Sequence, residues 1–310
     1  MYSHVLLLLL IFVVIKIRGT LCINQLRTQQ KRVFSPQFVY SDINSLGKRV
    51  LKDKKIIFCG LLRDKQDRVN TLLDNIEQIG KYCDDYSVVI FENDSVDSTR
   101  KLLELRSQHN KRVHIIGSNY SMKKTQTHDV DEERLTRMCF LRNQCLNYIQ
   151  ENLPFETFDF TVMWDMDLEC KLHVDHLWNS MYYMDSYYIN AVCAYSLIPM
   201  LAGNVFMYHD TFAHVENGMN HLKKGNKDIH LKTLKTYPSQ HTGYISDLKK
   251  VDSAFGGLCI YRTNELVKHN YSVTRDLYGD LECEHVNINR KLGGVYINPY
   301  MKLMITDNSY

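Results

Sequence analysis

Short apolar runs alternate with amphipathic helical patterns over the first half of the chain, and this alternation constrains the fold more than any other feature. Four runs are short enough to be buried strands: residues 54–62, 86–94, 111–118 and 158–167. Three helical segments with apolar residues every three or four positions lie between them: 63–83, 95–108 and 131–153. Strands that alternate with helices in this way predict an α/β fold, a mostly parallel sheet with helices on both faces.

The second half of the chain is less regular. After residue 170 the alternation weakens, but a strand and turn at 251–262, a helix within 276–294 and a closing strand at 295–305 are still expected. With 310 residues, of which 45% are hydrophobic, the chain can bury a normal core. We expect one catalytic domain over 53–310, with a first half at 53–170 and a second half at 171–310.

Charge and cysteine usage exclude two classes of partner. The 38 basic and 35 acidic residues are spread along the chain without a long basic run, so no nucleic-acid partner is expected. The nine cysteines are widely spaced and form no C-x-x-C, which argues against a zinc site. Most of them resemble small buried apolar residues. One or two disulfides are also compatible with the sequence if the compartment is luminal.

The amino-terminal segment predicts a membrane association. Residues 5–15 are eleven unbroken apolar residues, which is short against the ~20 that a spanning helix needs. A signal-peptide core, an uncleaved short anchor and an interfacial segment all fit this pattern. We therefore expect a hydrophobic signal or anchor at 1–20, a stem or linker at 21–52, and a location at a membrane, with the ER or Golgi lumen as the compartment and the topology open.

Polar clusters follow three of the predicted strands. Arg63 comes after the first strand, Glu92 and Asn93 after the second, and Asp165 and Asp167 after the fourth. The carboxyl ends of parallel strands meet at one edge of a sheet, where ligands bind in such folds. The sequence therefore predicts that these side chains converge on a ligand site.

The pair Asp165 and Asp167 suggests a metal. Acids on alternate strand positions point the same way and repel unless water, a base or a metal lies between them. An ordinary D-x-D is more often a solvated turn. Here the preceding strand is apolar and aromatic, so the pair lies at the mouth of the core, where Mg²⁺ or Mn²⁺ would accept carboxylate oxygens and keep positions open for phosphate.

Several enzyme classes are disfavoured by missing motifs. The chain has no G-x-G-x-x-G and no G-x-x-x-x-G-K-[ST], so a dinucleotide dehydrogenase and a P-loop enzyme are disfavoured. It has no G-x-S-x-G nucleophile elbow either.

Four motifs, taken together, resemble GT-A nucleotide-sugar glycosyltransferases. The stretch "VVIFENDSVDSTRKLL" is similar to the family's D-D-x-S-x-D-x-T after its second strand, with Glu92, Asn93, Ser95, Asp97 and Thr99 at the matching positions. An Arg-Asn pair, the D-x-D and a late acidic motif follow in the family's order: Arg142-Asn143, Asp165-Met166-Asp167 and Glu284-His285. The resemblance covers roughly 55–300. "MYHDTFAH" and "AFGGLCIY" add a fainter likeness to the branch related to fungal capsular mannosyltransferases.

The resemblance implies a UDP- or GDP-sugar donor, a glycan acceptor and Mn²⁺ or Mg²⁺. It implies Asp165 and Asp167 as metal ligands, with Glu284 and His285 as catalytic residues and His285 as an alternative third ligand. The substrate-binding residues that we expect are Arg63, Glu92, Asn93, Asp97, Arg142, Asp210, Gly256 and Gly257. Two departures from the family pattern leave questions open: Glu92-Asn93 leaves the base undefined, and His285 leaves the stereochemistry undefined.

Some of these residues have structural alternatives. Arg142 lies on an arginine-rich helix and can be salt-bridged instead of contacting phosphate. Gly256 and Gly257 can form an ordinary turn instead of admitting a ligand, and Asp210 can belong to the core or surface instead of a sugar pocket.

The sequence therefore predicts a metal-dependent glycosyltransferase that moves a hexose from a nucleotide diphosphate to a glycan hydroxyl. Two alternatives stay open. One is a catalytically inactive module that binds a glycan. The other, a sugar-nucleotide pyrophosphorylase, is disfavoured because "FCGLLRDKQDR" lacks the Gly-rich, Arg-bearing phosphate loop of that class.

Overall fold

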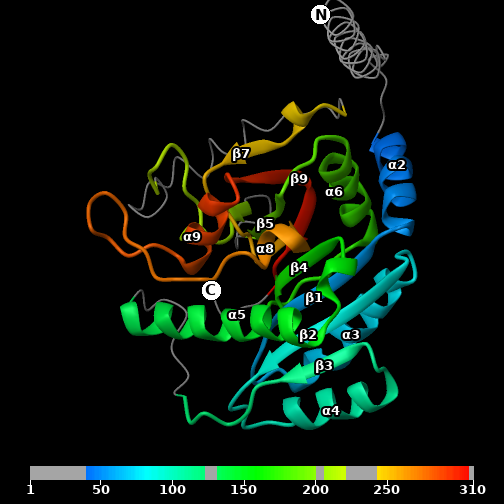
Figure 1. Ribbon diagram of the computed structural model, residues 1–310, viewed down its shortest axis with the longest axis vertical. Helices are drawn as coiled ribbons and strands as arrows, with labels where there is room; N and C mark the ends of the chain where they lie inside the picture. The colour runs from blue at the N-terminus through cyan, green and yellow to red at the C-terminus, as the bar shows by residue number, and fades with distance from the viewer. Residues whose placement is uncertain (1–39, 123–130, 200–205, 221–242, 307–310) are drawn as a thin grey trace, which may run out of the picture. The chain divides into compact units, whose positions relative to one another are not determined.

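The computed structural model describes residues 40–122, 131–199, 206–220 and 243–306 (Figure 1). The strands are β1 (Lys55–Leu62), β2 (Asp85–Glu92), β3 (Val113–Ile116), β4 (Phe160–Asp165), β5 (Ala191–Pro199), β6 (Phe206–Tyr208), β7 (Lys249–Val251), β8 (Leu258–Arg262) and β9 (Val295–Met304). The helices are α2 (Tyr40–Lys52), α3 (Gln66–Gly80), α4 (Thr99–His109), α5 (Glu132–Asn152), α6 (Val174–Ser186), α8 (Thr263–Leu266) and α9 (Glu284–Lys291).

All the described strands form one mixed sheet, in the order β3-β2-β1-β4-β8-β5-β9-β7, with β6 paired to β5. The first half is parallel throughout, because β1 pairs with β2 and β4, and β2 pairs with β3, in parallel. Antiparallel pairs begin where β4 meets β8 and continue at β5–β8, β5–β6 and β7–β9, while β5 and β9 are parallel. The predicted α/β class is confirmed, and the antiparallel pairs all involve second-half strands.

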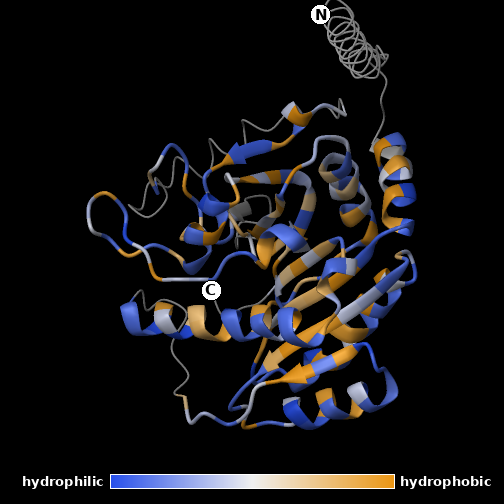
Figure 2. Ribbon diagram, viewed as in Figure 1, coloured by the Kyte–Doolittle hydropathy of each residue, from blue (hydrophilic) through white to orange (hydrophobic). Residues whose placement is uncertain are grey.

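Helices cover both faces of the sheet, as the sequence predicted. The chain runs outward from β1 to β3 and then returns past β1 to β4, and right-handed crossovers place the returning helix α5 on the face opposite α3 and α4. α5 packs against β1 and β2, and α3 packs against α4 (Figure 1). Hydrophobic residues gather in the central strands, whereas the helices mix hydrophilic and hydrophobic residues (Figure 2).

One hydrophobic cluster joins the two halves on the α5 face. It combines Cys59 of β1 and Met163 of β4 with Ile149 of α5, Ile288 of α9 and residues of β5, β8 and β9. Asp165 lies two positions after Met163 and therefore points to the same face. The end of β4 thus presents this carboxylate toward α5 and α9.

The strand register brings the predicted polar clusters together. Leu62, the last residue of β1, pairs with Glu92, the last residue of β2. Leu61 pairs with Asp165 at the end of β4. The residues after β1, β2 and β4 therefore lie along one edge of the sheet, as the alternation predicted.

Part of the expected stem is a helix of the same compact unit. α2 buries Ile43 and Leu51 completely and packs against α6. The contact is so close that a Cβ at Gly47 would lie 1.6 Å from the carbonyl oxygen of Trp178. The compact unit therefore begins at Tyr40, not at residue 53, and residues 21–39 of the expected stem lie outside the described residues.

The expected membrane association is corrected by the helices of the structure. Within residues 40–122, 131–199, 206–220 and 243–306, no helix combines the length and the apolar character needed to cross a membrane. The apolar segment at 1–20, on which the expectation of a membrane or luminal location depended, lies outside the described residues.

Candidate active site

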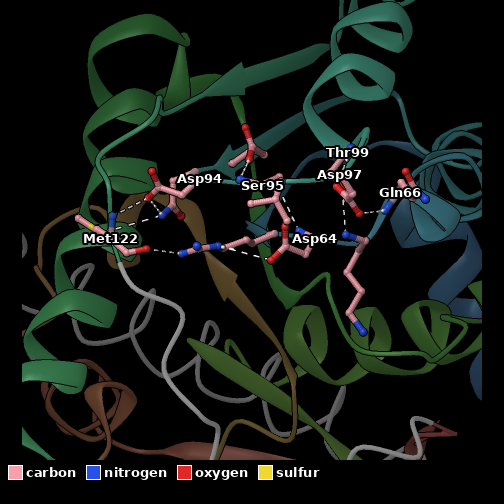
Figure 3. A network of polar contacts seen from close by, with 12 residues as sticks. Asp64, Gln66, Asp94, Ser95, Asp97, Thr99 and Met122 are labelled. Carbon is pink, nitrogen blue, oxygen red and sulfur yellow. Dashed lines mark hydrogen bonds and ion pairs between the residues drawn. The ribbon is translucent and has the colours of Figure 1, made fainter.

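The loops that follow β1 and β2 are locked together by hydrogen bonds. The amide of Asp64 donates to Ser95 Oγ at 3.0 Å, and the amide of Val96 donates back to Asp64 Oδ1 at 2.8 Å. Asp97 accepts from the amides of Gln66 at 3.1 Å and Thr99 at 2.9 Å. Figure 3 shows Asp64, Ser95 and Asp97 within this network. The carboxylate of Asp97 therefore holds the loops in place.

The predicted nucleoside contacts Glu92 and Asn93 also have partners inside the protein. Glu92 is 3% exposed and accepts from the amide of Ser95 and from Arg100, both at 3.1 Å. Asn93 Nδ2 donates to Asp94 Oδ2 at 2.8 Å. The contact of these side chains with a nucleoside stays a prediction.

Arg63 reaches across to the segment that follows β3. Its Nη1 donates to the carbonyl of Met122 at 2.9 Å (Figure 3). The same segment is held by Asp94, which accepts from the amides of Tyr120 and Ser121 at 2.8 Å and of Met122 at 3.2 Å. Arg63 therefore lies at the predicted edge, where its substrate contact stays a prediction.

A buried arginine joins carboxylates from both halves of the chain. Arg142 Nη2 of α5 donates to Asp165 Oδ1 at 2.8 Å, and Nε donates to Glu284 Oε1 at 3.0 Å. The side chain of Arg142 is 2% exposed, that of Glu284 is 6% exposed and that of Asp165 is 26% exposed. The structure thus brings together three predicted site residues that are distant in the sequence.

Aromatic rings enclose the guanidinium. Its carbon lies 5.1 Å from the centroid of the Phe255 ring and 5.9 Å from that of Tyr271, within the range of cation–π attraction. His285 stacks on Phe255 with the ring centroids 3.6 Å apart. Asn143 holds the Tyr271 backbone from both sides, since it donates to the carbonyl at 2.9 Å and accepts from the amide at 2.8 Å.

Several buried polar atoms of this cluster lack hydrogen-bond partners. Among the described residues, no partner is found for Arg142 Nη1, for Tyr271 Oη or for either ring nitrogen of His285. A buried polar atom without a partner costs about 1–3 kcal/mol. The folded chain tolerates this cost at the place where the predicted catalytic residues meet.

Burial and charge separate the acidities of the two carboxylates on Arg142. Burial alone would raise the pKa of Glu284, but the neighbouring His285 and Arg142 outweigh it and lower this pKa to about 2. Burial and the charge of Arg142 lower the pKa of His285 well below its usual value, against the opposing effect of the Glu284 charge. Glu284 is therefore ionised throughout the physiological range.

Asp165 shows the opposite shift. Desolvation, together with the nearby carboxylates of Asp167 and Asp210, raises its pKa to about 7 in spite of Arg142. Perturbed acids of this kind concentrate at functional sites. Asp165 is therefore harder to ionise than an ordinary aspartate, and a bound cation would favour its ionised form.

The turn at Gly256-Gly257 positions two of these acids. The amide of Gly256 donates to Asp210 Oδ2 at 3.1 Å, and the amide of Asp165 donates to the carbonyl of Gly257 at 2.8 Å. Both glycines have positive φ, 66° and 75°, and a Cβ at Gly256 would lie 2.5 Å from the carbonyl oxygen of Ala194. The turn thus requires glycine for backbone reasons.

The two D-x-D carboxylates, Asp165 and Asp167, could supply some of the ligands of a hard divalent ion. Asp165 Oδ1 is bonded to Arg142, so Oδ2 is the oxygen it can offer, whereas Asp167 is exposed at the strand end. Two carboxylates suit Mg²⁺ or Mn²⁺, which complete their shells with water and phosphate. The described residues contain no group of three His, Cys, Asp or Glu side chains that could hold a metal, so the role of His285 as a third ligand stays a prediction.

A cavity of about 1010 Å³ lies on the opposite face of the sheet from Arg142. It is lined by α3, by residues 169–176 and by the end of β9. None of the predicted site residues lines it. Trp164, the neighbour of Asp165 on β4, points into it instead, because successive strand residues face opposite ways.

The buried position of Arg142 was not predicted from the sequence. The expected apolar stripe of this helix ran through Leu135, Met138, Leu141, Cys145 and Ile149. The buried residues of α5 are instead Leu135, Cys139, Arg142, Cys145, Leu146 and Ile149. The sequence signal for this burial was that Arg142 shares a helix face with apolar residues. An arginine on a buried face needs carboxylate partners.

Comparison with known proteins returns distant structural likenesses only. No protein-family model matches the chain, and no curated protein sequence does. The similar solved structures include the mannosyltransferase PcManGT from Pyrobaculum calidifontis in complex with GDP-Man and Mn²⁺, with 13% identity over 86% of this chain and 65% of that one, at a TM-score of 0.45. They also include S. aureus TarS 1-349 in complex with UDP-GlcNAc, with 12% identity over 82% of this chain and 59% of that one, at a TM-score of 0.45.

The chain spans about six-tenths of the length of these two solved chains. At sequence identities of 13% and 12%, the likeness to these chains concerns only the arrangement of helices and strands. The activity of this chain therefore has to be argued from its own site.

Proposed function

We propose that the chain is a metal-dependent GT-A glycosyltransferase that transfers a hexose from a UDP- or GDP-sugar to a glycan hydroxyl. One observation carries this proposal: a buried arginine binds a D-x-D carboxylate and the glutamate of the late acidic motif at the carboxyl edge of β4. Ligands bind at this edge in open α/β sheets.

The cost of this arrangement supports a functional origin. Desolvating three charged groups costs several kcal/mol for each ion, and hydrophobic residues of similar volume are often as stable or more stable in the same place. Arg142 and Glu284 are nevertheless almost fully buried, and the cluster includes polar atoms without partners among the described residues. Chemistry, not stability, is the simplest reason to keep them.

Asp165 and Asp167 are the proposed ligands of Mn²⁺ or Mg²⁺. Such an ion, when bound, would offset the negative charge that develops on the departing diphosphate. Asp165 would contribute Oδ2, because Arg142 engages Oδ1. Asp167 is exposed two residues after the end of β4, so its carboxylate is accessible to such an ion.

Glu284 is better suited to hold a fixed negative charge than to remove a proton. A general base works best when its pKa is close to the operating pH. The pKa of about 2 makes Glu284 a weak base while Arg142 is bound to it. This favours a mechanism in which the acceptor hydroxyl loses its proton to another group, and the configuration of the product would report on it.

The nucleotide is proposed to lie along the ends of β1 and β2. Arg63, Glu92, Asn93 and Asp97 lie at the ends of these strands or in their loops, and the register of β1 with β2 and β4 supports a common edge with Asp165. Asp210, Gly256 and Gly257 approach from the second half, which is the proposed side of the transferred sugar and acceptor.

A donor screen tests the proposal. Purified protein is incubated with UDP- and GDP-sugars in Mn²⁺, and release of the nucleoside diphosphate is measured, with Asp167→Asn as the control. Metal-dependent hydrolysis or transfer that EDTA and Asp167→Asn abolish is expected. Glycan binding without turnover of any donor would favour an inactive binding module, and unchanged wild-type rates in EDTA would exclude the metal assignment.

A further inference from the structure

We infer that Arg142 is a positioning residue that fixes Asp165 and Glu284 relative to each other, and that it does not bind the diphosphate of the substrate. This inference rests on the proposed function and changes the role that the sequence suggested for Arg142. It also assigns a function to the contact between the end of β4 and the start of α9, which the sheet alone does not join.

The hydrogen bonds of the guanidinium support the inference. Nη2 and Nε are used by Asp165 at 2.8 Å and by Glu284 at 3.0 Å. The remaining nitrogen, Nη1, is itself buried and has no partner among the described residues. A phosphate could reach the guanidinium only if the cluster opened.

The walls of the site oppose such an opening. Phe255 lies beside the guanidinium, with His285 stacked on it. Tyr271 completes the enclosure, and Asn143, the next residue on α5, binds both its amide and its carbonyl. Adjacent residues of one helix thus anchor two different segments of the second half, α9 through Arg142 and residue 271 through Asn143.

Charge gives the anchor a specific consequence. Without Arg142, two carboxylates from separate elements would face each other with no cation between them, and they would repel. With it, one oxygen of Asp165 is held by a hydrogen bond, and Oδ2 is left as the oxygen that a ligand can contact. Arg142 therefore controls where Asp165 presents its free oxygen without touching the ligand.

The kinetic test compares Arg142→Lys with Arg106→Lys. Arg106 on α4 is a matched control, since it also binds two carboxylates, Asp74 at 2.7 Å and Glu77 at 3.0 Å, but these partners are more exposed and none of the three residues belongs to the predicted site. Lysine keeps the charge but loses the planar fork that binds two acids.

We expect Arg142→Lys to lower kcat by about 10²-fold, since a displacement of a positioned group by about 1 Å can have that effect, while the Kd of UDP or GDP measured by calorimetry changes less than about threefold. Arg106→Lys should leave both unchanged. A loss of nucleoside diphosphate affinity in step with kcat would make Arg142 a substrate contact and overturn the inference. Unchanged kcat in Arg142→Lys would overturn it as well.

A second experiment needs no activity. Arg142→Met leaves two acids without their cation, and we expect its Tm to fall by about 10 °C, because breaking a buried pair is strongly destabilising. Adding Glu284→Gln removes one of the charges and should recover part of this loss. If the double variant is no more stable than Arg142→Met, or does not fold, the inferred positioning role of Arg142 is overturned.

The two experiments separate the inference from the proposed function. A wild-type protein that binds neither UDP nor GDP and turns over no donor would contradict the proposed function. A higher Tm of the double variant than of Arg142→Met would still support the positioning role of Arg142 in that case. If the enzyme is active but Glu284→Gln does not raise the Tm of Arg142→Met, only the positioning role of Arg142 is contradicted.

Discussion

Two polar clusters lie at the same edge of the sheet and satisfy their charges in different ways. In the cluster of the β1 and β2 loops, Asp64, Asp94 and Asp97 accept hydrogen bonds from backbone amides (Figure 3). In the cluster around Arg142, charged side chains bind one another between aromatic rings, and several polar atoms have no partner among the described residues.

This difference distinguishes scaffold from chemistry. Backbone amides that bind a carboxylate are satisfied when the loop folds, so the loop cluster is explained by folding alone. The cluster around Arg142 costs desolvation energy and leaves pKa values shifted in opposite directions, to about 2 for Glu284 and about 7 for Asp165. The comparison therefore supports the proposal that the reactive chemistry lies at the second cluster, while the first shapes the edge.

The largest expected effect is on activity at the end of β4. Asp165→Asn and Asp167→Asn should each reduce metal-dependent turnover by ~10²-fold or more, because each removes one charge from the proposed metal site. Turnover and Mn²⁺ affinity are measured together with a circular dichroism spectrum that checks the fold. The assignment fails if either variant folds normally and keeps the wild-type rate.

A pH experiment tests the second cluster through its electrostatics. The folded-state pKa of Glu284 is lowered from 4.5 to about 2, so its ionised form stabilises the fold above pH 4.5, and this contribution is lost as the pH falls toward 2. A shift of this size corresponds to about 3 kcal/mol. Free energies of unfolding are measured by urea titration between pH 7 and 3 without metal.

Glu284→Gln provides the control for this pH dependence. The variant should lose stability at pH 7 and should show a shallower decline below pH 4.5, since the ionised group is gone. An unchanged slope in the variant would mean that other carboxylates produce the acid sensitivity and that the Glu284 pKa is not depressed by Arg142.

The parts of this comparison differed in how far the sequence could predict them. β1, β2 and β4 follow from local apolar runs, and the convergence of their polar ends follows from parallel topology. The order of β5, β7, β8 and β9 depends on pairings between distant segments, which local patterns do not encode. The Arg142 contacts depend on the same long-range placement of α9.

Two further elements show what local patterns leave undetermined. Residues 21–52 predict a stem or linker because they are polar and have few apolar repeats, although Ile43 and Leu51 give α2 a buried face against α6. Glu92 and Asn93 matched a ligand-binding motif, yet their side chains bind Arg100, Ser95 and Asp94. A motif specifies residue types, whereas the partner of a side chain is set by the three-dimensional neighbours.

A third prediction concerns the loop cluster. Asp94 accepts hydrogen bonds from three backbone amides of residues 120–122, so Asp94→Ala should lower the free energy of unfolding by about 1–3 kcal/mol. Turnover at saturating donor should change only a few-fold. Chemical denaturation and kcat are measured on the same preparation. A kcat loss as large as that of Asp167→Asn would place chemistry in the loop cluster and break the comparison.

The smallest expected effect tests whether the loop cluster contributes to donor binding at all. Glu92 is buried, but its ion pair with Arg100 is partly exposed to solvent, because the Arg100 side chain is 35% exposed. Glu92→Gln keeps an acceptor for the amide of Ser95 and weakens only this ion pair, so we expect the Kd of UDP or GDP to rise less than about fivefold, the range of a partly exposed salt bridge. Glu92→Ala also removes the acceptor and should raise the Kd further, since the loop loses its internal hydrogen bond. Calorimetry of both variants distinguishes loop shape from direct contact. If Gln and Ala weaken binding equally and strongly, the Glu92 carboxylate itself contacts the nucleoside; if neither changes the Kd, the nucleotide does not lie along β2.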